Sequence, residues 1–505
     1  MKTSVLNMTD GYKVDHRSQY PNQTSVVYSN WTPRKSRKPG IDKVVFFGLQ
    51  YYILEYLIKQ WNETFFSQPL DDVVSKYKRR IENYLGKGAI DYEHIVDLHN
   101  LGYLPLEIRA LPEGSYVPIR TPMMTIRNTR PEQFWLTNFL ETSLSNVLWA
   151  PCTAATIAKS FREVFDFWAK ETGGDEGFCY FQGHDFAYRG LIGTEAAQLI
   201  GGGHLLSFYG TDTIPAIDFL EDNYDADSDK EIVGASVPAT EHSVMCMHGE
   251  NGEFELFKKL ITEIYPTGVV SIVSDTWNLW NVFEYMDRLR DVIMNRDGCV
   301  VIRPDSSWTT PADIMCGLQS HPKLRDLSAK HRTFAIKGVW ENLWDIFGGV
   351  KNTKGYKVLS PKVGAIYGDA ISLQGADEIC ARLASKGFVP RMVFGIGSFT
   401  YQYNTRDTFG FAMKATYGMV GNETREIFKN PVTDSGEKKS ARGLLHVYEE
   451  DGKVMFHDQA TWEQACSGLL EQVFLDGKLV RKQSLREIRE ILSSSSILEQ
   501  RLVLK

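Results

Sequence analysis

The sequence predicts an α/β protein in which the middle of the chain forms a parallel sheet and the two ends form a second α/β domain. Three observations support this fold class. Apolar runs followed by helix-like stretches recur from about residue 200 to about residue 400, the flanking segments lack that repeat, and two hairpin-like turns lie near the C-terminus. We expect residues 1–150 and 401–505 to build the second domain around a central domain of residues 151–400.

Composition narrows the class of protein. A chain of 505 residues with 43% apolar and 24% charged residues is typical of a globular protein with two or three domains. Its net charge of −7 argues against nucleic acid as the main partner. The seven cysteines include no CxxC pair, which predicts reduced thiols in a cytoplasmic protein rather than a disulfide frame or zinc site. We expect no signal peptide and no membrane helix, because no apolar run is long enough.

The flanking segments have their own signals. Residues 131–148 and 153–171 each have the pattern of an amphipathic helix, the first with proline in its first turn. Asp-Gly turns at 451–452 and 476–477 lie between alternating runs and predict two β-hairpins. The stretch SLREIREIL predicts a closing helix.

The central repeat ends each apolar run in a polar group. These groups are Asp212, His242, Asp275, Asp305, Asp369 and the turn ending at Ser398. Most intervals between them are near 30 residues, about one βα unit. Each Asp or Ser alone is equally well explained as a helix cap. Six of them at repeated spacing favour a shared site, because the C-terminal strand ends form the ligand face of barrels and open α/β sheets alike.

Two motifs near these ends leave their chemistry open. The turn GIGS at 395–398 could cradle a phosphate, but short glycine turns are common, and it is neither a Walker A loop nor a full dinucleotide fingerprint. Downstream, Arg406, Lys414 and Lys429 could bind phosphate or belong to a solvated surface. The acidic strand ends could hold Mg²⁺ or bind sugar hydroxyls.

The stretch GHDFAYRG at 183–190 is also ambiguous. Phe186 could stack on a flat ring while Arg189 donates hydrogen bonds to a carbonyl or carboxylate. Alternatively, Phe186 belongs to the core and Arg189 pairs with Asp185. The loop ASVPATEHSVM, with His242 beside Glu241, leaves the histidine open as core filler, metal ligand, base or nucleophile.

In order along the chain, TDGYKVDH, GHDFAYRG, GTDT, SVPATEHS, SIVSD, IRPDS, GD and the FGIGS turn resemble the nicotinamide phosphoribosyltransferase family over nearly the whole sequence. The resemblance implies an irregular α/β barrel with a second α/β domain. It implies transfer of phosphoribose from 5-phosphoribosyl 1-pyrophosphate to nicotinamide in NAD salvage, with Mg²⁺ and with ATP as a coupling co-substrate. It further implies a homodimer with shared active sites and no nucleic-acid or membrane partner.

The resemblance also implies roles for single residues. His242 is the histidine that ATP phosphorylates, with Glu241, Asp275 and Asp305 as its catalytic neighbours. The residues implied around nicotinamide are Phe186, Arg189, Asp212, Arg303, Asp10 and, from the partner chain, Tyr12. Those implied around ribose and phosphates are Gly368, Asp369, Gly397, Ser398, Ser271, Arg34, Arg406, Lys414 and Lys429. Asp212 is expected to select the amide, because a carboxylate accepts from its NH₂ and repels nicotinate.

Some positions depart from the family pattern. The glycine-rich turn is GIGSF, Ala412 replaces a serine, Ser307 and Trp308 follow the RPDS motif, and Gly364 replaces an arginine. Three alternatives stay open: a nicotinate phosphoribosyltransferase, a non-catalytic ligand-binding homologue and, with the least support from ligand spacing, a metal-dependent barrel hydrolase.

Overall fold

The computed structural model of the protein describes residues 3–318, 320–429 and 441–494. Within these ranges the chain forms two compact units, one made of residues up to 156, 219–226 and those from 404 onward, the other of 157–218 and 227–403. We call them the sheet unit and the barrel unit. The last residues of the expected C-terminal segment, 495–505, lie outside the described residues.

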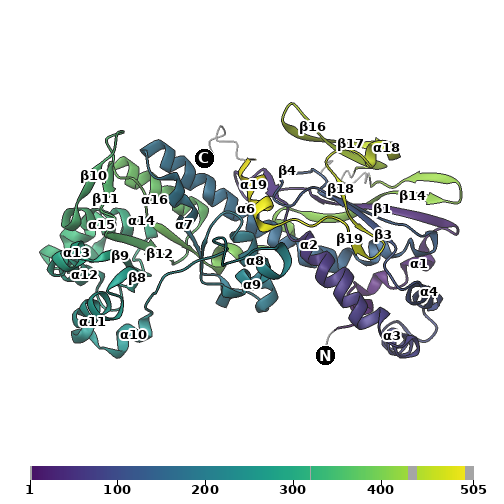
Figure 1. The fold of residues 1–505 in the computed structure, drawn as a ribbon, viewed down its shortest axis with the longest axis horizontal. Helices are drawn as coiled ribbons and strands as arrows, with labels where there is room; N and C mark the ends of the chain where they lie inside the picture. Colours follow the sequence, from purple (N-terminus) through teal and green to yellow (C-terminus); the bar gives the residue numbers. More distant parts are fainter. Residues whose placement is uncertain (1–2, 319, 430–440, 495–505) are drawn as a thin grey trace. The chain divides into compact units, whose positions relative to one another are not determined.

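The barrel unit contains a six-stranded parallel sheet, which confirms the predicted class (Figure 1). In spatial order its strands are β7 (Gly210–Thr211), β6 (Gly183–Asp185), β13 (Val393–Ile396), β12 (Val363–Tyr367), β9 (Asp297–Arg303) and β8 (Thr267–Val273). Four of these strands are short, so the extended pairing is concentrated in β8 and β9, which match residue for residue over their full length. The predicted run before Asp212 yields only the two residues of β7, because its first residues, 205–207, form the turn that follows α8.

An extended segment without regular strand structure joins the two edges of this sheet. The Thr211 N–H donates to the Ala235 carbonyl at 3.0 Å, and the Ser271 N–H donates to the Pro238 carbonyl at 2.9 Å. The Thr240 N–H returns a bond to the Ser271 carbonyl at 3.0 Å. Residues 235–240 therefore connect β7 to β8, and the sheet closes into an irregular barrel.

Helices follow the strands as expected for βα units. They are α7 (Cys179–Gln182), α8 (Gly193–His204), α9 (Ile214–Tyr224), α10 (His242–Met247), α11 (Glu253–Lys259), α12 (Leu279–Arg288), α13 (Arg290–Asn295), α14 (Pro311–Cys316), α15 (Ala329–Phe347), α16 (Leu373–Ser385) and α17 (Ser398–Tyr401). In α12, Trp280, Phe283 and Met286 recur at helical spacing and are buried, so this face packs inward. The small pair β10 (Gly349–Lys351) and β11 (Lys357–Leu359) is antiparallel.

The sheet unit is built on a seven-stranded sheet. In order its strands are β15 (Glu423–Glu426), β14 (Phe411–Val420), β1 (Thr24–Pro33), β5 (Met124–Asn128), β3 (Leu106–Ala110), β18 (Glu471–Leu475) and β19 (Lys478–Leu479). The pairing of β1 with both β14 and β5 brings the N- and C-terminal segments into one antiparallel sheet. The pair β2 (Lys43–Val45) and β4 (Tyr116–Pro118) and the helices α1 (His16–Gln19), α2 (Leu49–Tyr51), α3 (Leu70–Leu85), α4 (Glu93–Leu101), α5 (Leu136–Phe139) and α19 (Leu485–Ser494) complete it.

The two helices expected at 131–148 and 153–171 differ from the structure. A 3₁₀ turn (Pro131–Gln133) and the single turn of α5 come first, and then α6 runs without a break from Glu141 to Thr172. Pro151 lies inside α6. Its ring removes one backbone hydrogen bond, but apolar residues on both sides of it are buried, and that packing keeps the helix continuous.

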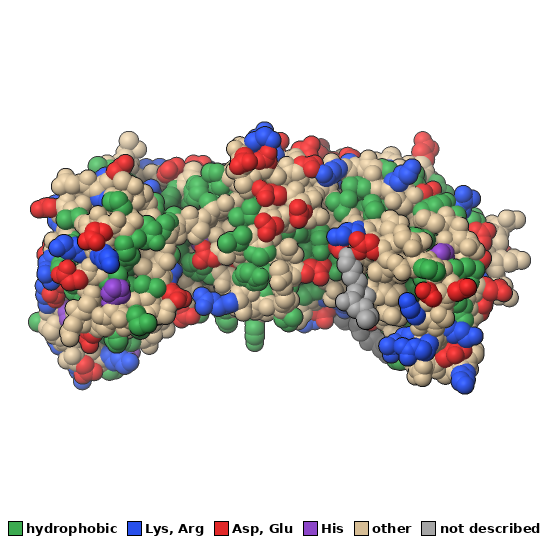
Figure 2. Space-filling model, turned by 60° about the horizontal axis from the view of Figure 1, so that its bottom comes forward, with side chains coloured by type: hydrophobic (Ala, Val, Ile, Leu, Met, Phe, Trp, Pro, Cys, Tyr) green, Lys and Arg blue, Asp and Glu red, His purple; other side chains and the backbone are tan. Residues whose placement is uncertain are grey.

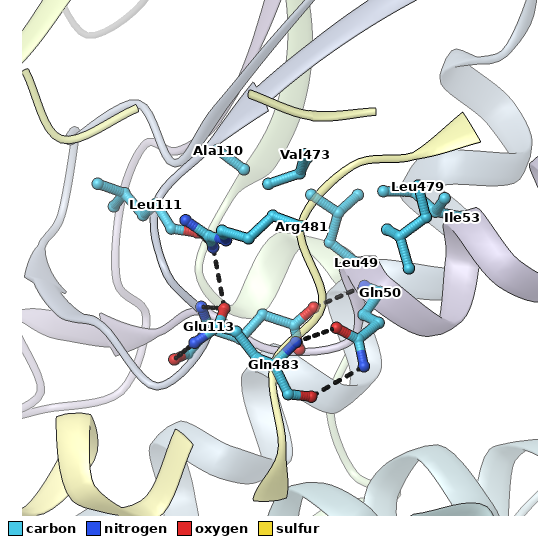
Figure 3. Close-up of a pocket in the computed structure, with 10 residues that line it drawn as sticks. All are labelled: Leu49, Gln50, Ile53, Ala110, Leu111, Glu113, Val473, Leu479, Arg481 and Gln483. Atoms are coloured by element: carbon cyan, nitrogen blue, oxygen red, sulfur yellow. Dashed lines mark hydrogen bonds between the residues drawn. The ribbon is translucent and has the colours of Figure 1, made fainter. Parts of the chain in front are cut away.

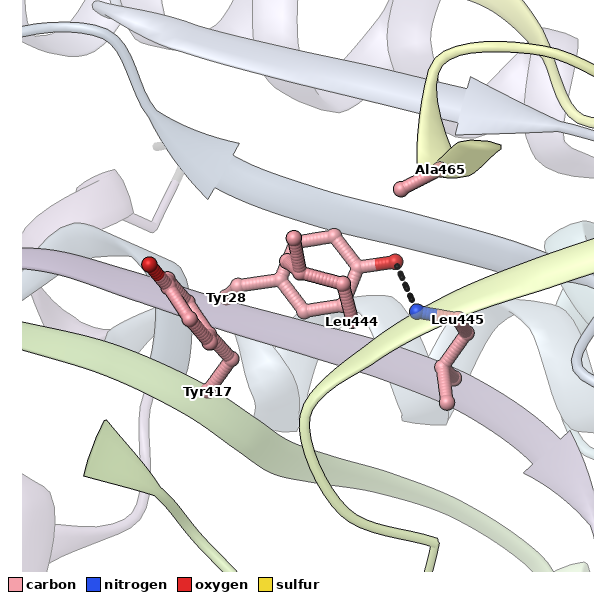
Figure 4. Packing of buried hydrophobic residues seen from close by; sticks show 5 residues of the cluster. All are labelled: Tyr28, Tyr417, Leu444, Leu445 and Ala465. Carbon is pink, nitrogen blue, oxygen red and sulfur yellow. Dashed lines mark hydrogen bonds between the residues drawn. The ribbon is translucent and has the colours of Figure 1, made fainter. Parts of the chain in front are cut away.

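Both predicted hairpins form, one as β16 (Leu444–Glu450) with β17 (Lys453–Ala460) and one as β18 with β19. Figure 4 shows how the first is fixed to the large sheet: Leu444 and Leu445 pack against Tyr28 and Tyr417 in one buried cluster. The Tyr28 hydroxyl accepts a hydrogen bond from the Leu445 N–H at 3.4 Å. The short α18 (Trp462–Ala465) follows β17 and contributes its last residue to the cluster.

A buried carboxylate, Glu113, connects residues 219–226 to the sheet unit. Figure 3 shows Glu113 beside Gln50 and Gln483. Glu113 accepts hydrogen bonds from the Gly48 N–H at 2.8 Å, the Gln50 N–H at 2.6 Å and the Tyr224 hydroxyl at 3.0 Å. The Glu113 N–H donates to Gln483 Oε1 at 2.8 Å. Burial raises the pKa of Glu113, opposed by these hydrogen bonds. The side chain and backbone of Glu113 together thus link residues 48–50, Tyr224 and Gln483.

Candidate active site

The predicted site residues that follow the barrel strands lie at the carboxyl-terminal ends of those strands. Phe186 follows β6, Asp212 follows β7, His242 follows the closing segment, and Asp275 follows β8. Asp305, Asp369 and Ser398 follow β9, β12 and β13. Parallel neighbouring strands place their carboxyl ends on the same side, so the barrel brings these residues together as the repeat predicted. We call this end of the barrel the rim.

Two glycines make space for the Phe186 ring at the rim. A Cβ atom on Gly395 would lie 2.4 Å from the ring, and one on Gly368 would lie 3.2 Å from it. The same position on Gly368 is 3.4 Å from Asp305 Oδ1. Phe186 is half-buried, so it is not the core residue that the alternative interpretation required. An aromatic face and a carboxylate are therefore neighbours across one glycine.

Arg189 does not form the ion pair with Asp185 that the sequence left open. Asp185 is fully buried and accepts from the Ala187 N–H at 2.8 Å and the Thr211 hydroxyl at 3.5 Å. Arg189 is exposed in the 3₁₀ turn Tyr188–Gly190, which follows Phe186 closely in the chain. The Arg189 guanidinium is therefore accessible to a ligand.

Asp212 is held by two donors on the same oxygen. His184 Nε2 lies 2.8 Å from Asp212 Oδ1, and the Ser236 hydroxyl donates to Oδ1 at 2.8 Å. Burial acts to raise the pKa of Asp212, but the hydrogen bond and charge of His184, the Ser236 bond and the charge of Arg303 together lower it. The side chain is ionised and 48% exposed. It presents a carboxylate oxygen to a ligand as a hydrogen-bond acceptor.

His242 opens α10 and contacts a buried carboxylate. Its Nε2 lies 3.3 Å from Asp275 Oδ1, and the Asp275 side chain is only 5% exposed, whereas His242 is 48% exposed. Asp275 Oδ2 accepts from the Asp305 N–H at 2.9 Å and the Ser306 hydroxyl at 2.5 Å. A fixed carboxylate thus orients one ring nitrogen, and Nδ1 is the nitrogen available for chemistry. Glu241 hydrogen-bonds Ser243 instead of the histidine.

Negative charge accumulates at the middle of the rim. Burial raises the pKa of Asp305, the charge of Arg303 opposes that change, and repulsion from Asp275 and Asp369 adds to it. Arg303 donates to the Thr240 carbonyl at 2.6 Å and so ties β9 to the closing segment. Among the residues that the structure describes, Arg303 Nε is buried and has no hydrogen-bond partner.

The remaining rim positions are backbone turns and one strand residue. Gly397 has an extended backbone with φ −96°, and a Cβ atom added to it would have nothing within 4 Å. Ser398 is the first residue of α17, and serine adopts a helical backbone without strain. The Ser398 hydroxyl lies beside Gly190. Ser271 is buried within β8, below the rim, and its hydroxyl has no partner in the described part of the chain.

The other expected site residues lie in the sheet unit. Tyr12 is 66% exposed, and Lys13 Nζ lies over its ring, 5.2 Å from the ring centre. Lys13 is buried and pairs with Glu141 at 2.7 Å. The Asp10 N–H donates to the Thr142 hydroxyl at 3.0 Å, and that hydroxyl donates back to Asp10 Oδ2 at 2.6 Å. These bonds fix the TDGYK turn to the start of α6.

Cations gather in the sheet unit near Lys414. Burial lowers the pKa of Lys414, Glu141 opposes the change, and the charges of Arg34, Lys13 and Arg406 lower the pKa further. Arg34 and Arg406 are exposed, and Lys429 is exposed after β15. Crowded like charges of this kind favour binding of an anion.

Several site residues were not predicted in a role. His184, Ser236 and Ser306 all donate to the rim carboxylates, and Lys13 supports Tyr12. Each lies within a motif that was recognised, but which side chains face each other depends on strand neighbours distant in sequence. The described residues contain no group of three His, Cys, Asp or Glu side chains that could hold a metal ion.

The surface and the helices add two facts about possible partners. On the face shown in Figure 2, acidic and basic side chains are mixed with apolar ones. None of the helices in the described ranges has the length and apolar character that a membrane crossing requires.

Comparisons with known proteins first define the class. The fold is similar to the crystal structure of nicotinate-nucleotide pyrophosphorylase from Pyrococcus furiosus, with a TM-score of 0.55 and 15% identity, covering 98% of this chain and 96% of that chain. The family model of the nicotinate phosphoribosyltransferase (NAPRTase) family matches residues 181–478. The protein is therefore a phosphoribosyltransferase.

More specific matches follow. The N-terminal domain model of nicotinamide phosphoribosyltransferase matches residues 4–108. The chain is 50% identical over 506 residues to the nicotinamide phosphoribosyltransferase of Acinetobacter baylyi, covering 97% of both, and 31% identical to that of Xanthomonas campestris pv. campestris, covering 96% of this chain and 97% of that one. The chain belongs to the nicotinate phosphoribosyltransferase family, within which these relatives are similar to it along their whole length.

Proposed function

We propose that the protein is a nicotinamide phosphoribosyltransferase that acts in NAD salvage. It transfers phosphoribose from 5-phosphoribosyl 1-pyrophosphate to nicotinamide and releases nicotinamide mononucleotide and pyrophosphate. The observation that carries this proposal is the 50% identity over 97% of the chain to a relative of that name. The ionised Asp212, whose partner His184 packs against Phe186, supports the choice of the amide.

The proposed base site uses three kinds of contact. Phe186 stacks on the pyridine ring, Tyr12 of the partner subunit covers its other face, and Arg189 donates to the amide carbonyl. Asp212 accepts from the amide NH₂ through its outer oxygen. The same oxygen repels the carboxylate of nicotinate, so a nicotinate phosphoribosyltransferase is the less favoured alternative.

The proposed transfer step depends on charge more than on proton movement. As pyrophosphate leaves, positive charge develops on the ribose, and Asp305 at the rim stabilises it. Gly368, Asp369, Gly397, Ser398 and Ser271 would surround the ribose phosphate. Arg34, Arg406, Lys414 and Lys429 would hold the remaining phosphates in a homodimer with shared sites. Mg²⁺ would bind through the substrate phosphates and offset the charge of the leaving pyrophosphate.

We further propose that ATP phosphorylates His242. Nδ1 attacks the γ-phosphorus of ATP, a P–N bond forms, the bond to the bridging oxygen breaks, and ADP leaves with that oxygen. Support comes from the orientation of the ring by Asp275, which leaves Nδ1 available, and from the exposure of the histidine. Hydrolysis of the P–N bond returns the imidazole, so each cycle would consume one ATP.

The test is incubation of the protein with nicotinamide and 5-phosphoribosyl 1-pyrophosphate, with and without ATP, followed by detection of the mononucleotide. Formation of the mononucleotide is expected, with a higher yield when ATP is present. A protein that binds nicotinamide but makes no product would instead be a non-catalytic homologue. Transfer of label from γ-labelled ATP to the protein, and its loss in His242→Ala, tests the phosphorylation separately.

We also propose a cytoplasmic location, supported by seven free cysteines.

A further inference from the structure

We infer that His184 is a specificity-determining residue: with Ser236 it fixes the orientation of the Asp212 carboxylate and so sets the preference for an amide over an acid. This inference rests on the proposed function and adds a residue to it. His184 belongs to the GHDF motif, but no role follows for it from the sequence. Its importance comes from a contact with a residue 28 positions away in the chain.

The barrel gives His184 a defined position. It is the middle residue of β6, where it pairs with Gly395 of β13 and Gly210 of β7. A Cβ atom on Gly210 would lie 2.7 Å from His184 Nδ1, so the missing side chain on that strand leaves room for the imidazole. The ring also packs against Phe186, with centroids 4.8 Å apart at an angle of 51°.

The proton on this histidine follows from its partner. Asp212 is ionised, and an ionised carboxylate only accepts hydrogen bonds. His184 Nε2 therefore carries the hydrogen in the 2.8 Å contact with Oδ1. Side-chain exposure is 12% for His184, so water competes weakly for this bond.

Both donors act on one oxygen of Asp212, and this decides what the ligand meets. His184 and Ser236 each lie 2.8 Å from Oδ1. Two donors converging on Oδ1 resist rotation of the carboxylate and leave Oδ2 as the oxygen that accepts from no donor among the described residues. A nicotinamide NH₂ then meets a fixed acceptor, whereas the carboxylate of nicotinate meets a fixed negative charge. Without His184, Asp212 would be held by the hydroxyl of Ser236 alone, itself on an exposed residue.

Two variants of His184 separate hydrogen bonding from packing. His184→Gln keeps an N–H donor close to the Nε2 position, and His184→Leu keeps much of the volume but no donor. Ser236→Ala removes the other donor on the same oxygen. The readouts are kcat and KM for nicotinamide and for nicotinate, together with calorimetric Kd values for both bases in the absence of the phosphoribosyl donor. Thermal melting of each variant checks that it is folded.

For His184→Leu we expect the ratio of kcat/KM for nicotinamide to that for nicotinate to fall about tenfold, the change expected for losing one hydrogen bond to a charged group. The fall should come from a higher KM and Kd for nicotinamide, with kcat little changed, because His184 touches no reacting atom. His184→Gln should restore the ratio to within about threefold of the unmutated protein. Ser236→Ala should lower it by less than His184→Leu.

Two results would overturn the inference: an unchanged ratio in a folded His184→Leu variant, or equal losses in His184→Gln and His184→Leu, which would indicate packing alone. The proposed function has a separate outcome. If the unmutated protein binds nicotinamide but forms no mononucleotide, the enzyme assignment fails while the Kd values still test His184. If it binds neither base, both are refuted.

Discussion

Asp212→Asn is the substitution that most directly tests substrate choice. In the unmutated protein Oδ1 accepts two hydrogen bonds, from His184 and Ser236. An asparagine would place its carbonyl oxygen at that position, because only the oxygen can accept from both donors. Its NH₂ would then occupy the place of Oδ2. The group that faces the ligand changes from an acceptor to a donor, with almost no change in shape.

The structure sets the size of the effect. Nicotinamide would lose a hydrogen bond to a charged acceptor, about 1.5 kcal/mol at the lower end of the usual range, because the Asp212 side chain is 48% exposed. Nicotinate would be relieved of a repulsion of about 1 kcal/mol between half-solvated carboxylates. Together these changes amount to roughly 2.5 kcal/mol, which corresponds to a shift of roughly 60-fold in the ratio of kcat/KM values.

Initial rates with each base at saturating 5-phosphoribosyl 1-pyrophosphate give this ratio. Asp218→Asn is the matched control, since it removes the same charge from an exposed position on α9. Its ratio should equal that of the unmutated protein. If Asp212→Asn left the ratio unchanged, or if the unmutated protein used both bases equally, the selectivity assigned to Asp212 would be incorrect.

Three further predictions concern the buried Glu253 at the start of α11 and two parts of the site. Burial raises the pKa of Glu253 to about 7, and repulsion from Glu250 and Asp275 adds to this rise. The free energy of unfolding should therefore fall by roughly 3 kcal/mol as pH rises from about 4.5 through about 7. The Tm of Glu253→Gln should decrease less than that of the unmutated protein between about pH 5 and about pH 8, and equal decreases would contradict this. Lys414→Gln should raise KM for the phosphoribosyl donor about tenfold and leave KM for nicotinamide unchanged; equal effects on both KM values would place Lys414 elsewhere. Mixing Asp305→Ala and Tyr12→Ala subunits, each inactive by itself, should restore about a quarter of the activity if each site is shared, because half of the dimers carry one intact site. No recovery after confirmed subunit exchange would argue against sharing.

The strand ends could be predicted because a buried parallel strand has a strong local signal. The runs before Asp275, Asp305 and Asp369 are apolar, end in a polar group and form β8, β9 and β12. The polar residue is fixed to the rim by covalent continuity with the strand. For this reason the gathering of the acidic residues followed from the sequence, and the fold class with it.

Other features depend on contacts between distant segments. The run that ends at His242 was expected to be one of the repeated strands, but its residues 235–240 close the barrel through isolated bridges rather than as a regular strand. The partner of Asp212 is His184, which could be identified only after β6 and β7 were known to be neighbours. Similarly, Pro151 predicts a helix boundary locally, and only the burial of its neighbours keeps α6 continuous.

The pKa shifts show that the protein holds two sets of like charges. Asp305 is repelled by Asp275 and Asp369, and Lys414 is repelled by Arg34 and other cations. Each set is unfavourable on its own and would be stabilised by a ligand of opposite charge. In the proposed transfer, the ribose of the phosphoribosyl donor becomes cationic while pyrophosphate leaves as an anion. The rim carboxylates are suited to the first of these charges, so the electrostatic cost of their mutual repulsion would decrease most when the bond to pyrophosphate breaks.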